Sequence, residues 1–230
     1  MAQDRAERFE AFVVWYLRFN GYFTVPNFVV HAGDDQARIS GEVVGNKTEV
    51  DTIAVRFPYS REASGTPFPT DKNLVEGAGG RFDVVFAEVK SGRGDSPNKI
   101  WRNGEVADIE YLLRFLGWHN SDDEIREAAT ALSQKFIFEA DNLRIRYIIF
   151  ADRVDSVWNK KGVTYVTFDD CVRFISEERG QCWAESGIGR RSMHDQWSTL
   201  AKKIFEVANS ESLTPETRQH NIRDLLENGS

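Results

Sequence analysis

The run "RFDVVFAEVKSG", residues 81–92, contains the feature that decides the fold. Its apolar residues, rich in Val and Phe, predict a buried strand over 82–90. Glu88 and Lys90 close this strand, and they share one face because alternate residues of a strand point the same way. An acid and a base that project together at the end of a buried strand are either an ordinary ion pair or part of a site.

The strand predicted upstream brings two more acids. In "TEVDTIAV", residues 48–55, Glu49 and Asp51 lie two positions apart and so share a face. If this strand neighbours the first one, Asp51, Glu88 and Lys90 meet at one edge of the sheet. Two carboxylates there would bind a hard cation such as Mg²⁺, with Mn²⁺ as a substitute, because such ions prefer oxygen ligands. A metal beside a lysine suits hydrolysis of a phosphodiester bond.

A third acid precedes both strands. Residues 4–20 predict a helix, because apolar residues recur every three or four positions. Glu10 lies in this largely apolar segment, close in helical phase to Val13 and Leu17, and Glu7 is the alternative one turn earlier. A carboxylate turned toward the sheet needs a partner, and a metal is one. Taken alone, either acid also fits a solvated position on a helix.

The order of these pieces resembles the PD-(D/E)XK nuclease superfamily, most of all its Holliday-junction-resolvase-like and Mrr-like restriction-endonuclease branches. A helix with an acid precedes Gly21-Tyr22, "EVDTIA" opens the second core strand, and "FAEVK" ends the third. The resemblance is close over residues 5–92 and loose over 130–178. It implies an α/β, restriction-endonuclease-like core: a mixed central sheet flanked by helices, in αβββαβ order.

The same resemblance implies the roles of the site residues. Asp51, Glu88 and Glu10 would bind the metal. Lys90 would complete the catalytic set by assisting the water or the phosphate. Glu49 would be a supporting acid behind the metal ligands.

Basic residues follow the expected site in "KSGRGDSPNKIWR", residues 90–102, the best local basic patch of the chain. Nucleic acids are commonly held by such residues at phosphates and by aromatic rings that stack on bases. The substrate-binding residues expected here are Arg93, Lys99, Trp101 and Arg102. Gln134 matches a glutamine that many members of the superfamily carry on the helix after the E-x-K, and it is expected to contact substrate as well.

Two regions go beyond a minimal nuclease. Residues 1–180 form the expected nuclease domain, with an inserted loop at about 56–81 that is rich in Pro, Gly, Ser and Thr. Because the insert follows Asp51 in the sequence, we expect it beside the site, where it would control what enters. Residues 190–230 are expected to form a C-terminal helical extension that packs on this domain or on a second subunit.

The remaining patterns predict a succession of helices and strands. The predicted segments are a strand over 22–32 interrupted near Pro26, helices over 104–118 and 122–139, strands over 143–151 and 163–168, a helix over 169–179, a Gly-rich linker over 180–192, and helices over 193–209 and 214–227.

Composition limits the classes of function. The chain has 230 residues and a net charge of −7, so nucleic acid would have to bind a local patch rather than the whole surface. No run is long and apolar enough to span a bilayer, and the chain opens with no signal-peptide pattern. The two cysteines make neither a metal-ligand cluster nor a disulfide framework. We therefore expect a cytoplasmic protein without a membrane partner.

These patterns predict a Mg²⁺-dependent phosphodiesterase, a nuclease expected to act on DNA in defence, restriction or repair. The sequence leaves open RNA as the substrate, a homodimer, and a protein partner or activator. One alternative is a catalytically inactive nuclease-fold module that binds nucleic acid or a protein partner. Another is an α/β domain in which Glu88, Lys90 and Asp51 form ordinary ion pairs.

Overall fold

The computed structural model describes residues 2–31, 46–60, 69–92, 94–186 and 197–229. The strands are β1 (Tyr22–His31), β2 (Asn46–Arg56), β3 (Phe82–Lys90), β4 (Ile137–Glu139), β5 (Leu143–Ala151) and β6 (Thr164–Thr167). The helices are α1 (Ala2–Phe19), α3 (Lys72–Val75), α4 (Lys99–Asn103), α5 (Val106–Leu116), α6 (Asp122–Lys135), α7 (Ser156–Lys160), α8 (Phe168–Phe174), α9 (Gly180–Ser186), α10 (Thr199–Ala208) and α11 (Pro215–Asn228), with a π-helical turn (Ile175–Arg179) between α8 and α9.

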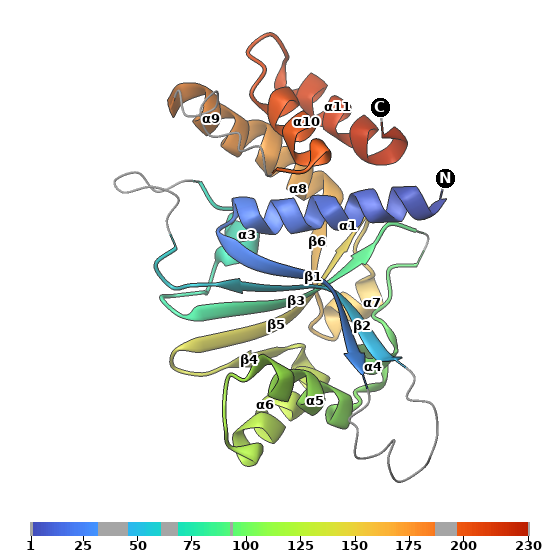
Figure 1. Cartoon of the computed structure of the whole chain (residues 1–230), viewed down its shortest axis with the longest axis vertical. Coiled ribbons are helices and arrows are strands. Elements are labelled where there is room, and N and C mark those ends of the chain that lie inside the picture. The colour runs from blue at the N-terminus through green and yellow to red at the C-terminus, as the bar shows by residue number, and fades with distance from the viewer. Residues whose placement is uncertain (1, 32–45, 61–68, 93, 187–196, 230) are drawn as a thin grey trace.

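One mixed, six-stranded sheet organises the described part of the chain (Figure 1). β1, β2 and β3 follow one another as antiparallel neighbours, and β5 lies parallel to β3. The other edge of β5 is shared, because β4 pairs near its start and β6 near its end. The protein is therefore an α/β protein with a mixed sheet, as the sequence predicts.

Helices cover both faces of the sheet. In Figure 1, α1 runs across one face with the C-terminal helices stacked outside it, and α5 and α6 lie on the other face. Two clusters of buried side chains match these layers. One joins α1 and the C-terminal helices to Val85 and Ala87 of β3, and the other joins α4, α5 and α6 to Val84 and Phe86. Successive residues of β3 alternate between the clusters, as strand geometry requires.

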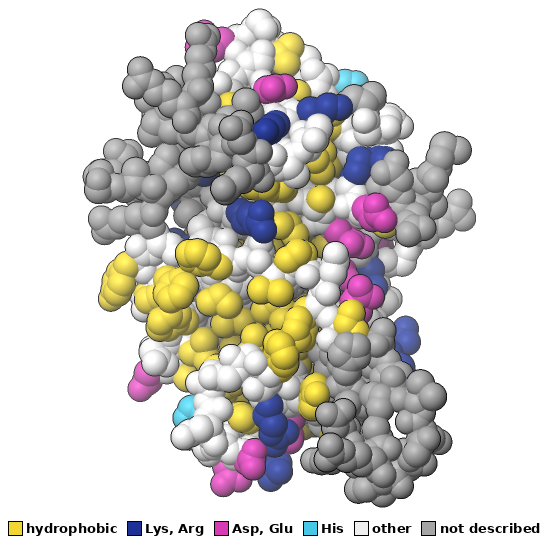
Figure 2. Space-filling model, in the orientation of Figure 1, with side chains coloured by type: hydrophobic (Ala, Val, Ile, Leu, Met, Phe, Trp, Pro, Cys, Tyr) yellow, Lys and Arg dark blue, Asp and Glu magenta, His cyan; other side chains and the backbone are white. Residues whose placement is uncertain are grey.

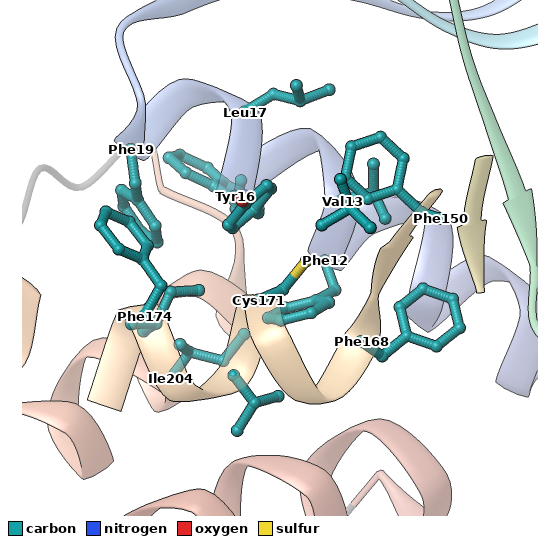
Figure 3. Packing of buried hydrophobic residues seen from close by; sticks show 14 of the residues in the cluster. Phe12, Val13, Tyr16, Leu17, Phe19, Phe150, Phe168, Cys171, Phe174 and Ile204 are labelled. Carbon is teal, nitrogen blue, oxygen red and sulfur yellow. The ribbon is translucent and has the colours of Figure 1, made fainter. Parts of the chain in front are cut away.

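The helix α1 is buried from two sides, which explains its apolar composition. Phe12 and Tyr16 of α1 meet Cys171 and Phe174 of α8, and Ile204 of α10 closes the cluster (Figure 3). Burying a large apolar side chain contributes about 1.5–3 kcal/mol. The sequence left open whether the C-terminal extension packs on its own domain or on a second subunit. The described helices α10 and α11 pack on α1 of their own chain.

Polar contacts tie the two ends of the described chain together. Arg5 Nε donates to Glu227 Oε2 at 2.5 Å. Arg8 donates to the carbonyl oxygens of Leu226 and Glu227 at 2.9 and 2.7 Å. The last turn of α11 therefore fixes the first turns of α1, and the marked ends lie on the same side of the molecule in Figure 1.

Two predicted boundaries are wrong for local reasons. β1 continues through Pro26, because β1 is the edge strand of the described sheet and a missing N–H is tolerated at an edge. α6 ends at Lys135 instead of 139, because Phe136 adopts a left-handed conformation with φ of 60°. Residues 137–139 then pair with β5 as β4.

The predicted linker over 180–192 begins as a helix. α9 continues α8 through the π-helical turn, and residues 187–192 lie outside the described part. Gly180 is the point where this helix passes the end of α10. A Cβ there would lie 2.4 Å from the carbonyl oxygen of Ala208. The glycine that indicated a loop is therefore required by the close approach of two helices.

The described residues of the insert leave the sheet at the end opposite to Asp51, whereas the sequence placed the insert beside the site; its residues 61–68 lie outside the described part. Because β2 and β3 are antiparallel, the connection from Arg56 to Phe82 joins the far ends of the two strands. Asp51 and Arg56 are separated by about 17 Å along an extended strand. Figure 1 accordingly shows α3, which belongs to the insert, and α4, which follows β3, at opposite ends of the sheet.

A buried ionic cluster anchors the insert. Asp83 of β3 accepts hydrogen bonds from Arg144 and Arg146 of β5 and from the hydroxyl of Tyr22. The same arginines donate at 2.5 and 2.7 Å to backbone carbonyls in and just after α3. Burial raises the pKa of Asp83, but the hydrogen bonds and charges of the two arginines outweigh this effect and hold the pKa below its usual value.

One apolar patch is exposed on the face shown in Figure 2. Phe23 and Val25 of β1 are 68 and 55% exposed. The ring of Phe57 lies 5.5 Å from that of Phe23 and 5.3 Å from that of Phe82.

Within the described ranges, no helix has the length and apolar character that crossing a membrane requires.

Replacing Asp83 by alanine tests the ionic cluster. The change leaves two buried guanidinium groups without their counter-ion, so we expect the free energy of unfolding at pH 7 to fall by about 3–5 kcal/mol. Because the pKa of Asp83 is lowered in the folded state, its contribution is present above the unfolded pKa, about 3.9, and is lost as the pH falls through the folded pKa. Urea unfolding followed by tryptophan fluorescence measures the loss.

Glu139→Ala is the matched control for Asp83→Ala. It breaks the partly exposed pair between Arg81 and Glu139 and should cost about 1 kcal/mol or less. Equal losses in the two variants would contradict the view that the buried cluster anchors the insert.

Candidate active site

The strands β2 and β3 part at Asp51. Their backbone pairing ends at Thr52 and Ala87. Beyond that point the Oδ2 of Asp51 accepts the N–H of Val89 at 2.6 Å. A side-chain carboxylate thus replaces the backbone acceptor, and the two strands diverge around an acid. We call this place the strand fork, formed by residues 49–51 and 88–90.

Glu88 lies in the strand fork and is 5% exposed. Its Oε1 forms an ion pair with Nζ of Lys90, as their shared strand face predicts. Its Oε2 accepts hydrogen bonds from the hydroxyl of Tyr147 and, at 3.2 Å, from the backbone N–H of Asn98. Burial raises the pKa of Tyr147 well above its usual value, so the hydroxyl keeps its proton and remains a donor.

The helix acid approaches the strand fork from α1. Glu10 is partly buried whereas Glu7 is exposed, so Glu10 is the acid turned toward the protein. Burial raises the pKa of Glu10, and the charges of Glu49 and Glu7 raise it further. The charge of Glu10 also acts on Asp51. The acids of α1 and β2 therefore act on one another: the charge of Glu49 raises the pKa of Glu10, and the charge of Glu10 raises the pKa of Asp51.

The pKa of Asp51 is raised to about 6. Burial is the largest cause, and the negative charges of Glu88 and Glu10 add to it. The N–H of Val89 and the charge of Lys90 act in the opposite direction. A cation bound beside Asp51 would favour the ionised form of the carboxyl group.

The donors in the strand fork suit a hard cation, because they are carboxylate oxygens. Oδ1 of Asp51 accepts no hydrogen bond from the described residues, whereas Oε1 of Glu88 is paired with Lys90. In the part of the chain that the structure describes, no three His, Cys, Asp or Glu side chains are grouped so as to hold a metal ion.

Residues 94–98, which follow β3, are fixed beside the strand fork. Tyr165 of β6 donates to the carbonyl of Asp95 at 2.8 Å, and Arg153 pairs with the Asp95 carboxylate at 2.9 Å. At the end of this loop, Asn98 donates to Glu88 through its N–H and to the carbonyl of Glu49 through its side chain at 3.5 Å. Asn98 therefore contacts both strands of the fork.

Three of the predicted substrate-binding residues lie on α4. Lys99 and Arg102 are exposed, directly after the loop that contacts Glu88. Trp101 is 2% exposed, and its ring stacks on Tyr147 with centroids 4.3 Å apart. This burial corrects the prediction for Trp101, because a ring enclosed in the core does not offer a face to a base.

Of the other two predicted contacts, the structure describes only Gln134. Gln134 is exposed on α6 and makes no hydrogen bond to any described residue. Arg93 lies outside the described residues. A surface hollow of about 590 Å³ lies beside α4 and α5, and no described residue of the strand fork lines it. The described residues that line it are Lys99, Ile100, Glu105, Val106, Ala107 and Asp108.

Tyr147 and Asn98 are contacts of the site that sequence reasoning missed. Tyr147 lies in "LRIRYIIFA", residues 143–151, where a tyrosine looks like one more core residue. The available signal was that a buried tyrosine hydroxyl needs a hydrogen-bond partner. Nothing in the sequence marks Asn98, because its contact with Glu88 is made by the backbone.

Comparison with known proteins gives no match to a protein family, to a curated protein or to a solved structure. A functional proposal therefore rests on the residues and geometry of the strand fork and on the motif resemblance.

Asp51→Asn tests the electrostatic cost of the strand fork. The folded pKa of Asp51, about 6, lies above the unfolded value, about 3.9, so ionisation of Asp51 destabilises the fold progressively between those values and fully above them. The amide is uncharged and still accepts the N–H of Val89. We therefore expect the variant to be more stable than the wild type by about 1–3 kcal/mol at pH 8 without metal, as measured by urea unfolding.

The pH and a second variant control this test. At pH 4 the gain should disappear, because folded Asp51 is then protonated in the wild type. Asp152→Asn removes a carboxylate that is paired with Arg223 and should give no gain at pH 8. Equal stability of Asp51→Asn and the wild type at pH 8 would show that ionisation of Asp51 does not destabilise the fold.

Proposed function

We propose that the protein is a Mg²⁺-dependent nuclease that hydrolyses phosphodiester bonds in DNA, with Mn²⁺ as a substitute metal. The observation that carries the proposal is the strand fork, where Asp51 and Glu88 meet Lys90 at the end of a buried strand. Glu10 acts on the same place from α1. Acids that surround a single lysine in a half-buried place suit metal-assisted hydrolysis of a phosphodiester.

The order of elements supports a restriction-endonuclease-like core. α1 precedes the antiparallel strands β1, β2 and β3, and the helices α4 to α6 lead to β5, which is parallel to β3. This order agrees with the αβββαβ order that the motif resemblance implies, with β4, β6 and the C-terminal helices as additions. The acids Glu10, Asp51 and Glu88 lie on α1, β2 and β3, as that resemblance requires.

The chemistry of each side chain sets its proposed role. Asp51 and Glu88 would hold the metal, and Glu10 would complete the set directly or through water. When bound, the metal lowers the pKa of the attacking water and offsets charge on the phosphoryl oxygens. Lys90 orients the water or stabilises negative charge that develops on the phosphate. Burial of Glu88 strengthens these interactions, because charges in low-dielectric surroundings are less screened.

The proposed substrate approaches along α4 and the loop before it. Lys99 and Arg102 are exposed there and would contact phosphates on either side of the cut bond. We place the activity in defence, restriction or repair, which is an inference from the motif resemblance. A homodimer would suit the cutting of both strands, since two sites related by a two-fold axis match the symmetry of a duplex.

A second candidate is an inactive nuclease-fold module that binds nucleic acid or a protein partner. Two observations favour it: Lys90 is already paired with Glu88, and the described residues offer no ready group of three metal-binding side chains. Metal binding separates the candidates, because a ligand that binds only the folded state raises its stability. An active fork should gain stability with Mn²⁺, and an inactive module should not.

Lys90→Ala tests the proposed chemistry. Purified protein is incubated in Mg²⁺ or Mn²⁺ with labelled duplex, single-stranded and branched DNA and with RNA. Because Lys90 supplies positive charge at the reacting phosphate, we expect metal-dependent cutting by the variant to fall by about 100-fold or more. Lys160→Ala, on the surface of α7, should cut like the wild type.

Three outcomes would count against the nuclease. Equal cutting by the wild type and Lys90→Ala would indicate a contaminant. No cutting, together with no rise in the Tm on addition of Mn²⁺, would favour the inactive module. Cutting that does not need a metal would remove the role proposed for Asp51 and Glu88.

A further inference from the structure

Glu88 is held asymmetrically. Its Oε2 accepts two hydrogen bonds, from the hydroxyl of Tyr147 and from the N–H of Asn98. Its Oε1 contacts only Nζ of Lys90 among the residues that the structure describes. The donors to Oε2 belong to a central strand and to a backbone fixed at the start of α4, whereas the Lys90 side chain is long and 27% exposed. Oε2 is therefore held in place, whereas Oε1 is paired with the side chain of Lys90, which can move.

Tyr147 is itself fixed by packing. It is 1% exposed and lies on β5, which pairs with β3 along the whole of both strands. The ring of Trp101 stacks on it at 4.3 Å with an interplanar angle of 21°, and Phe136 lies 6.1 Å away on centroids. The phenol cannot turn away from Glu88 without breaking this stack. Trp101 therefore supports the site from the core.

The asymmetry has a chemical consequence. A carboxylate that rotates freely can present either oxygen, or both, to a cation. A carboxylate whose Oε2 is held by two donors presents Oε1. Groups that orient a metal ligand commonly change metal affinity by about 10–100-fold, although they do not touch the metal.

We propose that Tyr147 is a positioning residue of the strand fork, which holds Glu88 so that Oε1 is the atom presented to a divalent cation. The inference rests on the proposed function, since it specifies how one of the proposed metal ligands is oriented. On this proposal the cation binds Oε1 of Glu88, the oxygen that faces Lys90.

Tyr16 provides a matched control. Its hydroxyl also donates to a buried carboxylate, Asp71, at 2.7 Å. Asp71 caps α3 in the insert, and Tyr16 belongs to the cluster between α1 and the C-terminal helices. Tyr16→Phe therefore removes the same chemical group from a buried hydrogen bond outside the strand fork.

The experiment measures the Mn²⁺ affinity of the full chain and of both variants at one pH, from the EPR signal of free Mn²⁺. We expect Tyr147→Phe to weaken Mn²⁺ binding about 10-fold. Its cutting rate should fall at low Mn²⁺ and recover toward that of the wild type as Mn²⁺ is raised. Tyr16→Phe should lower the Tm of the metal-free protein and leave Mn²⁺ affinity unchanged.

The outcomes separate this inference from the proposed function. A wild type that binds Mn²⁺ and cuts, beside a Tyr147→Phe protein with unchanged Mn²⁺ affinity, overturns the positioning role alone. A wild type that neither binds Mn²⁺ nor cuts overturns both. If Tyr147→Phe does not fold, Trp101→Phe replaces it, because this change keeps the hydroxyl and alters only the ring that supports it. Weaker Mn²⁺ binding by Trp101→Phe would support the positioning role, and unchanged binding would overturn it.

Discussion

The hydrogen bond from the N–H of Val89 to the carboxylate of Asp51 determines where β2 and β3 separate. A backbone acceptor in that place would extend the ladder and close the space between the strands. The carboxylate satisfies the same donor but brings a charge into a half-buried position, and the raised pKa of Asp51 reflects the cost. The rest of the site depends on the separation, because Glu88 and Lys90 project from β3 where its partner strand has left.

The position of Glu10 depends on residues at the other end of the chain. α1 lies between the sheet and the C-terminal helices, and Arg5 near its start is hydrogen-bonded to Glu227, which is 222 residues away in the sequence. α1 also meets the start of α10, where the indole N–H of Trp15 donates to the hydroxyl of Ser198 at 2.9 Å. The C-terminal helices therefore belong to the structural support of the site, although they contribute none of its acids.

The central strands were predictable because strands buried on both faces are nearly continuous apolar runs, and β3 and β5 have the predicted bounds. The elements that carry Asp51 and Glu88 were predictable for the same reason. The prediction for Trp101 was wrong because a tryptophan among basic residues is typical of a nucleic-acid contact. Its burial depends on stacking against Tyr147, which is distant in the sequence. The place of the insert was not predicted. It depends on the antiparallel pairing of β2 and β3, which the order of residues in the sequence does not show.

The edge of the sheet has a property that bears on assembly. β1 carries part of the exposed apolar patch, including Phe23 and Val25. Pro26, in the middle of β1, has no N–H, and the next residue, Asn27, has a left-handed backbone with φ of 54°. A strand from another molecule would lose hydrogen bonds at this point, which discourages aggregation by edge-to-edge growth of the sheet. A second molecule that covers Phe23 and Val25 must therefore meet them through side chains, without extending the sheet.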